Sequence, residues 1–420
     1  MTTLTQDPDH GSAEWFPPES LDRATLRGWT RWCAVRHSFT PAPLITLNEY
    51  NKRSPREKRL YDLHRIATHG NLPILNTPMT DLVDEAIQSR LLAGAFGAPE
   101  RTRPGTMVSG AGYQGKTETI CAICADFHDE WLELNQHLNP RAIAGTRDLV
   151  APVAYVKTPV TATPKSTCEA ILDFYGEDYK GMNLSALERT VRRSLVDHAT
   201  QVLILDDITR LRLHREADSN SLDIIRGFMD VTVLILVGVD IPHSGLLRSG
   251  CRDPRTGEWV IPEVPDKSKS PNDLAATQSD RRFNLVDLDA FSYGTTESTA
   301  AWVAHLTGIE SHLRLLRTGE HPLTSGDMPE YLYRRTGGIV GYLDSLLKEA
   351  CLKAIQTRTE DLTRDLLDST LIKPNDLPGR DPAAGEVPPV PPQPNPPTPK
   401  KLRKRGRNTV FDDHGPQEGE

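Results

Sequence analysis

The sequence lacks the features of a secreted or membrane-spanning protein. Its first fifteen residues contain neither a basic start nor an apolar run, so no secretory signal peptide is expected. The longest apolar stretch, Val231 to Val239, is far too short to cross a bilayer. We therefore expect a cytoplasmic protein that makes no membrane contact.

Cysteine is scarce, with six residues in a chain of 420. In a cytoplasmic protein we expect these to be free thiols. Cys121 and Cys124 form a C-x-x-C pair, but no second pair of ligands has the spacing of a metal site. Packing of the two side chains in a helix core is therefore favoured over redox or metal chemistry.

Basic residues are outnumbered, and the formal net charge is −8. The chain as a whole is therefore not a general nucleic-acid binder, and any such contact must come from a local patch. Its length allows two or three domains with a real core. Hydrophobic residues make up 37% and charged residues 25%, which is typical of a globular protein with some disordered parts.

The stretch from Thr106 to Ile120 fits G-x-x-x-x-G-K-[ST], the pattern of loops that bind nucleotide phosphates. Gly110, Gly112 and Gly115 permit backbone angles that a side chain would forbid, so successive N–H groups can turn inward on an anion. A helix that starts after this loop points its positive end at the same anion. The residues expected to bind the nucleotide here are Gly110, Ala111, Gly112, Tyr113, Gln114, Gly115, Lys116 and Thr117.

Two side chains of this loop have distinct expected roles. Lys116 would reach the outer phosphates, and the Thr117 hydroxyl would bind Mg²⁺. Met107 and Val108 end a short apolar strand before the loop, and residues 119–127 have the pattern of a helix with a buried face. A chance match in a glycine-rich loop is the alternative, and the flanking strand and helix argue against it.

Further strands and helices alternate after the loop. Strands are expected at 150–157, 202–208, 231–240 and 283–288, and helices at 166–175, 184–198 and 221–229. The continuous apolarity of the run from Val202 and of the run from Val231 is typical of strands buried on both faces of a parallel sheet. The pattern predicts an α/β domain with a mostly parallel sheet flanked by helices.

Helices are expected on both sides of this domain. Before the phosphate loop they start near Leu21, Ser54 and Thr77, the last two with a capping residue followed by proline. This front is either a structural collar on the nucleotide domain or a docking surface for a partner protein or DNA. After the sheet we expect a small all-helical lid with helices at 297–317, 328–335, 339–357 and 359–369.

The last part of the chain is rich in proline, with ten prolines among the 22 residues from Pro378 to Pro399. This composition predicts an extended, disordered linker. The linker leads to residues 400–407, where six of eight residues are basic. This basic segment is either a solvated tail or a contact with DNA phosphates. Residues 249–280 are either a functional loop or a disordered insertion. We therefore expect four parts: a helical front at 1–100, an ATPase domain at 101–292, a lid at 293–375, and the linker with its tail at 376–420.

Two acids follow the second buried strand. Asp206 stands at the carboxyl edge, where open α/β sheets bind ligands, and a carboxylate there can hold Mg²⁺ together with Thr117. Asp207 could orient the water that attacks the γ-phosphate. The pair could instead cap a helix, but the phosphate loop about ninety residues earlier favours magnesium. The residue usual at the place of Asp207 is the longer Glu, so hydrolysis could be slow.

Three further residues are candidates with an open alternative. Asp240 ends the next apolar strand and is either a contact for the γ-phosphate or a turn residue. Arg281 and Arg282 precede the last strand and are either a finger that reaches a neighbouring subunit's nucleotide or a surface basic pair. No Asn-Lys-x-Asp segment follows the loop to read guanine, so ATP is the expected nucleotide.

The order of these parts resembles the AAA+ ATPases over roughly residues 50–370. Within them, three features are most similar to the bacterial TniB/TnsC group of transposition ATPases: the helical front, the Leu-Asp-Asp-Ile-x-Arg-Leu segment 205–211 and the Thr-Gly-Gly-x-x-Gly segment 336–341. The resemblance implies an ATP-dependent homo-oligomer that binds double-stranded target DNA and recruits or activates a transposase. By position it makes Lys116 and Thr117 the nucleotide and Mg²⁺ ligands, Asp206 the metal-side acid, Asp207 the catalytic acid, Asp240 the sensor and Arg281 or Arg282 the finger.

The sequence departs from the family pattern at three places. Asp207 is shorter than the usual acid, Asp240 replaces Asn or Thr, and Ile339 and Val340 stand where many lids carry an arginine. These departures bear on turnover more than on binding. The alternative function is a signalling or defence NTPase that senses a partner protein without binding DNA, and a small-molecule kinase is the weaker third hypothesis.

Overall fold

The computed structural model describes residue 15 and residues 21–98, 101–139, 150–211, 223–244, 251–252, 259–260 and 282–372. These belong to one compact unit, Met1–Pro382, and the second unit, Ala383–Glu420, lies outside the described residues. The expected basic tail and the proline-rich linker therefore lie outside them, as do most of residues 249–280. None of the helices in the described part is long and apolar enough to span a bilayer.

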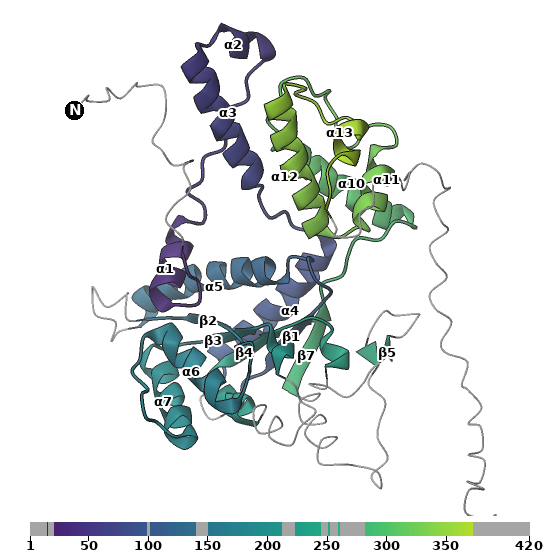
Figure 1. Cartoon of the computed structure of the whole chain (residues 1–420). Coiled ribbons are helices and arrows are strands. Elements are labelled where there is room, and N and C mark those ends of the chain that lie inside the picture. Colours follow the sequence, from purple (N-terminus) through teal and green to yellow (C-terminus); the bar gives the residue numbers. More distant parts are fainter. Residues whose placement is uncertain are drawn as a thin grey trace, which may run out of the picture. The chain divides into compact units, whose positions relative to one another are not determined.

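A five-stranded parallel sheet forms the core of the α/β part of the chain, with strand order β2-β3-β4-β1-β7 (Figure 1). Its strands are β1 (Gly105–Ser109), β2 (Val153–Lys157), β3 (Val202–Asp206), β4 (Val233–Val237) and β7 (Phe283–Asp287). Residues of β1, β3 and β4 are buried throughout, which explains their continuous apolar runs. A separate antiparallel pair joins β5 (Cys251–Arg252) and β6 (Trp259–Val260).

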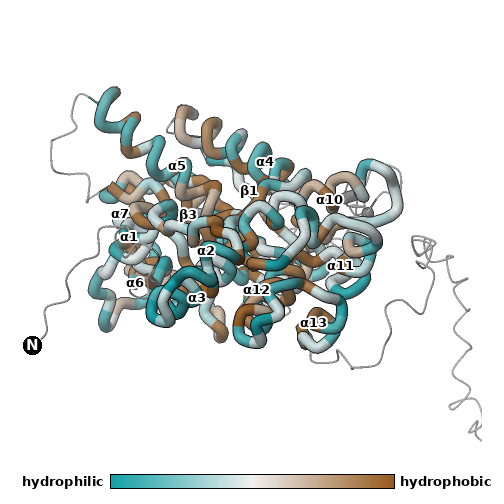
Figure 2. The backbone as a smooth tube through the Cα atoms, turned by 90° about the horizontal axis from the view of Figure 1, so that it is seen from above, coloured by the Kyte–Doolittle hydropathy of each residue, from teal (hydrophilic) through white to brown (hydrophobic). Residues whose placement is uncertain are grey.

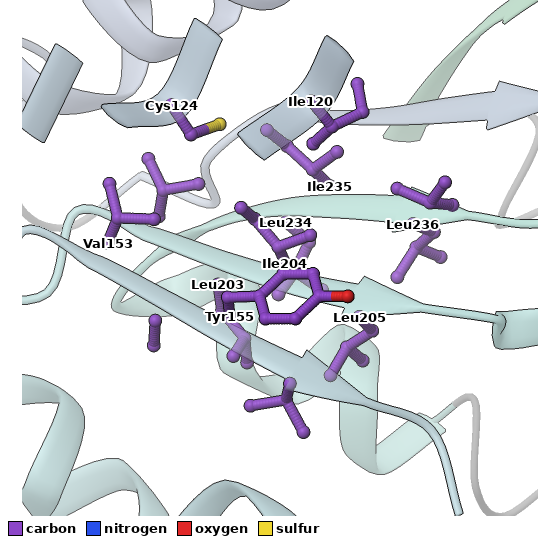
Figure 3. Close-up of a cluster of buried hydrophobic side chains, with 14 of the residues drawn as sticks. Ile120, Cys124, Val153, Tyr155, Leu203, Ile204, Leu205, Leu234, Ile235 and Leu236 are labelled. Carbon is purple, nitrogen blue, oxygen red and sulfur yellow. The ribbon is translucent and has the colours of Figure 1, made fainter. Parts of the chain in front are cut away.

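Helices cover both faces of the sheet. In Figure 1, α4 (Pro78–Ala95) and α5 (Lys116–Leu138) lie on one face, and α6 (Pro164–Tyr175) and α7 (Leu184–Asp197) lie on the other. Figure 3 shows Ile120 and Cys124 of α5 facing the side chains of β2, β3 and β4. Cys121 and Cys124 are fully buried, and burial raises the pKa of the Cys121 thiol to about 12. Core packing of this pair is confirmed.

The helical front divides between two cores. Trp29 of α1 (Leu26–Val35) and Val83, Ile87 and Leu91 of α4 belong to the core around the sheet. In contrast, α2 (Leu47–Lys52) and α3 (Pro55–Gly70) join the last part of the chain, because Arg65 of α3 forms an ion pair with Glu360. The expected helix starts at Ser54 and Thr77 are confirmed, and each residue caps its helix with proline at the next position.

The lid consists of α10 (Thr296–Glu310), α11 (Met328–Thr336), α12 (Val340–Thr357) and α13 (Arg364–Asp368) around its own apolar core. Two expected helices are shorter than predicted. The helix from 297 ends at Glu310, because Arg314 beyond it donates its backbone N–H to His69 of α3. The helix from 359 begins only at Arg364, because Arg358 and Glu360 have left-handed backbone angles that interrupt it.

The tube in Figure 2 separates these parts by polarity. The central strands are largely hydrophobic, whereas the α2–α3 stretch is largely hydrophilic. A sheet that is apolar throughout must be covered on both faces, as it is here. The polar α2–α3 stretch has its own small core, made of Ala42, Tyr50 and Tyr61 with Leu316 of the lid packed against it.

Candidate nucleotide-binding site

The expected phosphate loop connects the end of β1 to the start of α5. Gly115 has φ of 78° and stands directly before the helix, a left-handed conformation that glycine adopts without strain. At Gly110 a side chain would not fit, because a Cβ there would lie 2.5 Å from the Leu288 carbonyl oxygen. The loop is therefore tightly placed between the sheet and the chain that follows β7.

Lys116 turns its side chain back over the loop. Its Nζ donates to the carbonyl oxygens of Gly110, at 3.0 Å, and Ala111, at 2.6 Å. Burial lowers the pKa of Lys116, while the nearby carboxylates of Asp206 and Asp207 act in the opposite direction. A buried ammonium placed inside an N–H-rich loop is suited to an anion with several negative oxygens.

The side chains of Thr117 and Asp206 meet directly. The Thr117 hydroxyl donates to Asp206 Oδ2 at 2.8 Å, although the two residues are 89 positions apart. Asp206 is buried, and its other oxygen accepts the backbone N–H of Asp207 at 2.9 Å. The structure thus brings the loop and the acid at the end of β3 together, as the sequence predicted.

Tyr155 is a member of this cluster that the sequence analysis did not identify. It lies on β2, the strand next to β3, and its hydroxyl donates to Asp206 Oδ2 at 2.8 Å. Burial, together with the adjacent Asp206, raises the pKa of Tyr155, so the phenol keeps its proton. Figure 3 shows its oxygen at the end of a ring that lies among apolar side chains. In the sequence, the one indication of this role was a tyrosine within an otherwise aliphatic run.

Asp207 forms an ion pair with Arg210, a role for Arg210 that the sequence did not predict. Its carboxylate pairs with Arg210 at 2.7 Å, and Arg210 also donates to the Thr158 carbonyl after β2 at 2.8 Å. Asp207 has φ of 55°, and its side chain makes no hydrogen bond to the start of the following 3-10 helix. Asp207 therefore does not cap this helix with its side chain. Arg210 is part of the 205–211 segment, which therefore contains both the acid and its partner.

Asp240 lies near the start of the loop, because the next residue, Ile241, donates its backbone N–H to Ser109 Oγ at 3.2 Å. It precedes the short 3-10 helix Ile241–His243, and its carboxylate contacts His243 Nδ1 at 2.6 Å. Its side chain is 60% exposed. This is the geometry of a turn residue, and its role as a sensor stays a prediction.

Arg282 lies at the opposite edge of the sheet from the loop. It directly precedes β7, whose first residue, Phe283, pairs in parallel with Gly105 at the start of β1. The phosphate loop follows the other end of β1, about 15 Å further along the strand. Arg282 is exposed, and Arg281 lies outside the described residues.

The lid contacts the loop at Tyr113. The backbone N–H of Gly341, in the first turn of α12, donates to the Tyr113 carbonyl at 2.8 Å, and the rings of Tyr113 and Tyr342 stack at 5.2 Å. A side chain at position 341 would place its Cβ 2.4 Å from that carbonyl oxygen. Arg334 pairs with Glu330, and Arg335 donates to the Thr370 carbonyl, so both arginines before the glycine pair have partners within the lid.

This arrangement fits ATP and Mg²⁺ by the chemistry of its donors. Hard oxygen ligands, the Thr117 hydroxyl and the Asp206 carboxylate, meet where a magnesium ion bound to phosphates would lie. The loop supplies backbone N–H groups, the helix start and the Lys116 ammonium to the anion. Among the described residues, no cluster of His, Cys, Asp and Glu forms a separate metal site.

Residues 100–241 match the model of a family described as an AAA domain. This range contains the loop, Asp206, Asp207 and Asp240. Together with the five parallel strands and the helical lid, the match assigns the fold to the P-loop NTPases of AAA+ type. The sequence matches none of the curated proteins closely enough to be recognised as a relative.

Several solved structures are similar at low identity. The Orc1 protein of Aeropyrum pernix, solved in complex with DNA, is 12% identical with a TM-score of 0.46, covering 70% of this chain and 65% of that one. A RuvB variant of Thermotoga maritima is 14% identical with a TM-score of 0.34, covering 68% and 66%. PCH-2 of C. elegans is 8% identical with a TM-score of 0.29, covering 72% and 70%. The chain thus spans just under two thirds of the first two proteins.

Proposed function

We propose that this protein binds and hydrolyses ATP with Mg²⁺, and that it assembles on double-stranded DNA to regulate transposition. The observation that carries the ATPase part is the 2.8 Å contact between Thr117 and Asp206 beside the buried Lys116. Lys116 would bind the outer phosphates, and Thr117 and Asp206 would hold Mg²⁺. When bound, Mg²⁺ supplies positive charge against the phosphate oxygens.

The remaining roles follow from position. Asp207 is the proposed acid that orients the attacking water, and its pairing with Arg210 fixes the direction of its carboxylate. Asp240 is proposed to sense the γ-phosphate after rotation away from His243. The proposed parts of the chain are the front 1–100, the ATPase domain 101–292, the lid 293–375, and the linker and tail 376–420.

DNA binding, self-assembly and recruitment of a transposase rest on the resemblance to the TniB/TnsC group. The exposed Arg282 lies far from the loop of its own chain, so as a finger it would serve the nucleotide of a neighbouring copy. The basic residues 400–407 are proposed as an additional, non-specific contact with phosphates. A cytoplasmic location is part of the same proposal.

The ATPase part is tested with Lys116→Ala and Asp207→Asn. Lys116→Ala should abolish binding of a fluorescent ATP analogue, because the buried cation is lost. Asp207→Asn should bind the analogue normally and lose phosphate release by about 100-fold, in the range for removal of a catalytic base. The control is Asp197→Asn, an exposed acid at the end of α7. Wild-type phosphate release from Asp207→Asn would refute the water-orienting role.

The DNA part is tested with a labelled duplex in the presence of ATP, ADP or no nucleotide, over a salt series. We expect binding that needs ATP and weakens steeply with salt, as for contacts with phosphates. An absence of duplex binding in every nucleotide state, with ATP still bound, would favour an NTPase that senses a partner protein.

A further inference from the structure

The corner between α2 and α3 is the most densely basic part of the described chain. Five of the eight residues from Lys52 to Arg59 are basic, in a protein whose net charge is −8. We name this surface the basic corner, and its cations are Lys52, Arg53, Arg56, Lys58 and Arg59.

The acids of the corner are engaged with the backbone. Glu49 accepts the backbone N–H of Thr46 at 2.7 Å, and Glu57 accepts that of Ser54 at 2.7 Å, each in a capping box at a helix start. These bonds hold both carboxylates at the helix starts, where the five cations of the corner outnumber them. The corner keeps a positive surface.

The cations are presented in two ways. Lys52, Arg56 and Arg59 are exposed to solvent. Arg53 and Lys58 are partly buried and lie over the rings of Tyr61 and Tyr50, at 4.7 Å and 5.4 Å from the ring centres. These stacking contacts order the two long side chains while leaving their charge in place.

The lid adds cations at the same place. Leu316 packs against the small core beneath the corner, which brings the exposed Arg317 to its border. Arg358 contacts both Tyr50 and Asp62, and its side chain remains 59% exposed. The positive surface thus extends from α2 and α3 onto the lid.

A buried ionic network fixes the corner to the lid. Arg65 is fully buried and donates to both carboxylate oxygens of Glu360, at 2.6 Å and 2.9 Å, and to Asp62 at 2.5 Å. Removal of one partner from such a network leaves a buried charge uncompensated. The corner is therefore presented as a preorganised surface.

We propose that the basic corner is a contact surface for the phosphates of double-stranded DNA. This inference rests on the proposed DNA association and assigns it to a specific surface. Duplex DNA presents closely spaced negative charges along its axis, which match a surface with several exposed cations. Exposed Leu60 and Leu63 on α3 would suit a protein partner, but they are outnumbered by the cations beside them.

The same geometry connects the corner to the nucleotide. The first turn of α12 touches the phosphate loop at Tyr113, and the chain directly after α12 provides Arg358 and Glu360 to α3. A helix of 18 residues is a straight connection about 27 Å long. Movement of the lid at the loop therefore moves the corner, which gives DNA contact at this surface a dependence on ATP.

The test compares two triple variants in duplex binding with ATP over a salt series. Lys52→Ala/Arg56→Ala/Arg59→Ala removes the exposed cations of the corner. Lys180→Ala/Arg189→Ala/Arg193→Ala removes three exposed cations at and before α7 and is the matched control for net charge. The corner variant should lose at least about tenfold in affinity, and its slope of log K against log salt should fall by about 2 to 3. The control should keep the wild-type slope.

A second variant, Arg56→Lys/Arg59→Lys, preserves charge and should retain the slope. Equal losses in the corner and control variants would overturn the inference, because net charge alone would explain both. An unchanged corner variant would also overturn it and would leave Leu60 and Leu63 as candidates for a protein contact. Wild-type protein that binds no duplex in ATP would instead refute the proposed DNA association itself, and the assigned surface with it.

Discussion

A single oxygen of Asp206 joins two parts of the site. Its Oδ2 accepts hydrogen bonds from both the Thr117 hydroxyl and the Tyr155 hydroxyl. Two donors on one oxygen fix the direction of the carboxylate, as outer partners of metal ligands commonly do. The ring of Tyr155 is itself stacked on Trp29 at 6.1 Å, which ties α1 to the site.

We predict that Tyr155→Phe raises the Mg²⁺ requirement of the proposed ATPase activity by about tenfold or more, in the range found for partners of metal ligands. The ring and its stacking on Trp29 remain, so the fold should be preserved. A magnesium titration of phosphate release measures the effect. The control is Tyr175→Phe, because the Tyr175 hydroxyl is also buried but bonds to Thr200, away from the loop. Equal magnesium requirements in both variants and wild type would contradict the positioning role.

The site residues that could be predicted from the sequence were those in a recognisable local pattern. The phosphate loop has a characteristic spacing of Gly, Lys and Thr, and Asp206 follows an apolar run, so both could be predicted from the sequence alone. Tyr155 and Arg210 act across strands, on partners 51 and 52 residues away. Their roles depend on the pairing of β2 with β3, which no local pattern contains.

At the scale of elements, the lid is held by interactions that the helical pattern does not contain. The spacing of apolar residues predicted the bounds of α11 and α12 closely. For α10 it predicted a helix to residue 317, whereas the helix ends at Glu310. That helix ends where residues 311–317 turn to meet α3, through the Arg314 N–H to His69 at 2.9 Å. Long-range contacts of this kind override helix propensity.

Two buried histidines make this region sensitive to acid. Burial first, and then the charges of Arg65 and Arg314, lower the pKa of His69 to about 3. Burial lowers the pKa of His305 to about 4, and neither of its ring nitrogens has a hydrogen-bond partner among the described residues. Both imidazoles are neutral in the native state and would be protonated in the unfolded chain below about pH 6.5.

We predict that stability falls as the pH is lowered from about 6.5, because the unfolded chain binds more protons than the native one in this range. At pH 5 each histidine should cost about 2 kcal/mol of unfolding free energy relative to pH 7 or above. His305→Leu removes one of the two groups and should reduce the drop in thermal midpoint between pH 7 and pH 5. The control is His37→Leu, an exposed histidine. A pH dependence unchanged by His305→Leu would contradict a neutral buried imidazole.

At the scale of the whole molecule, the proposed finger would act only with a second copy of the chain. Arg282 stands at the start of β7, and the phosphate loop follows the far end of the neighbouring β1. No small side-chain movement brings the two together within one chain, since the length of the sheet separates them. A head-to-tail contact between copies would place the start of one β7 near the loop of the next, and repetition of that contact would give a ring or a filament.

This geometry predicts complementation between two inactive variants. Arg281→Ala/Arg282→Ala has an intact loop but no finger, and Lys116→Ala has a finger but binds no nucleotide. An equal mixture should recover about a quarter of wild-type phosphate release, because about one interface in four pairs a working loop with a working finger. Mixing Lys116→Ala with Asp207→Asn is the control and should recover nothing, since both lesions then lie in the loop-side site. If the double arginine variant alone hydrolysed ATP at the wild-type rate, Arg281 and Arg282 would be surface residues without a catalytic role. If the mixture were as inactive as its components, a finger supplied by the neighbouring copy would be excluded.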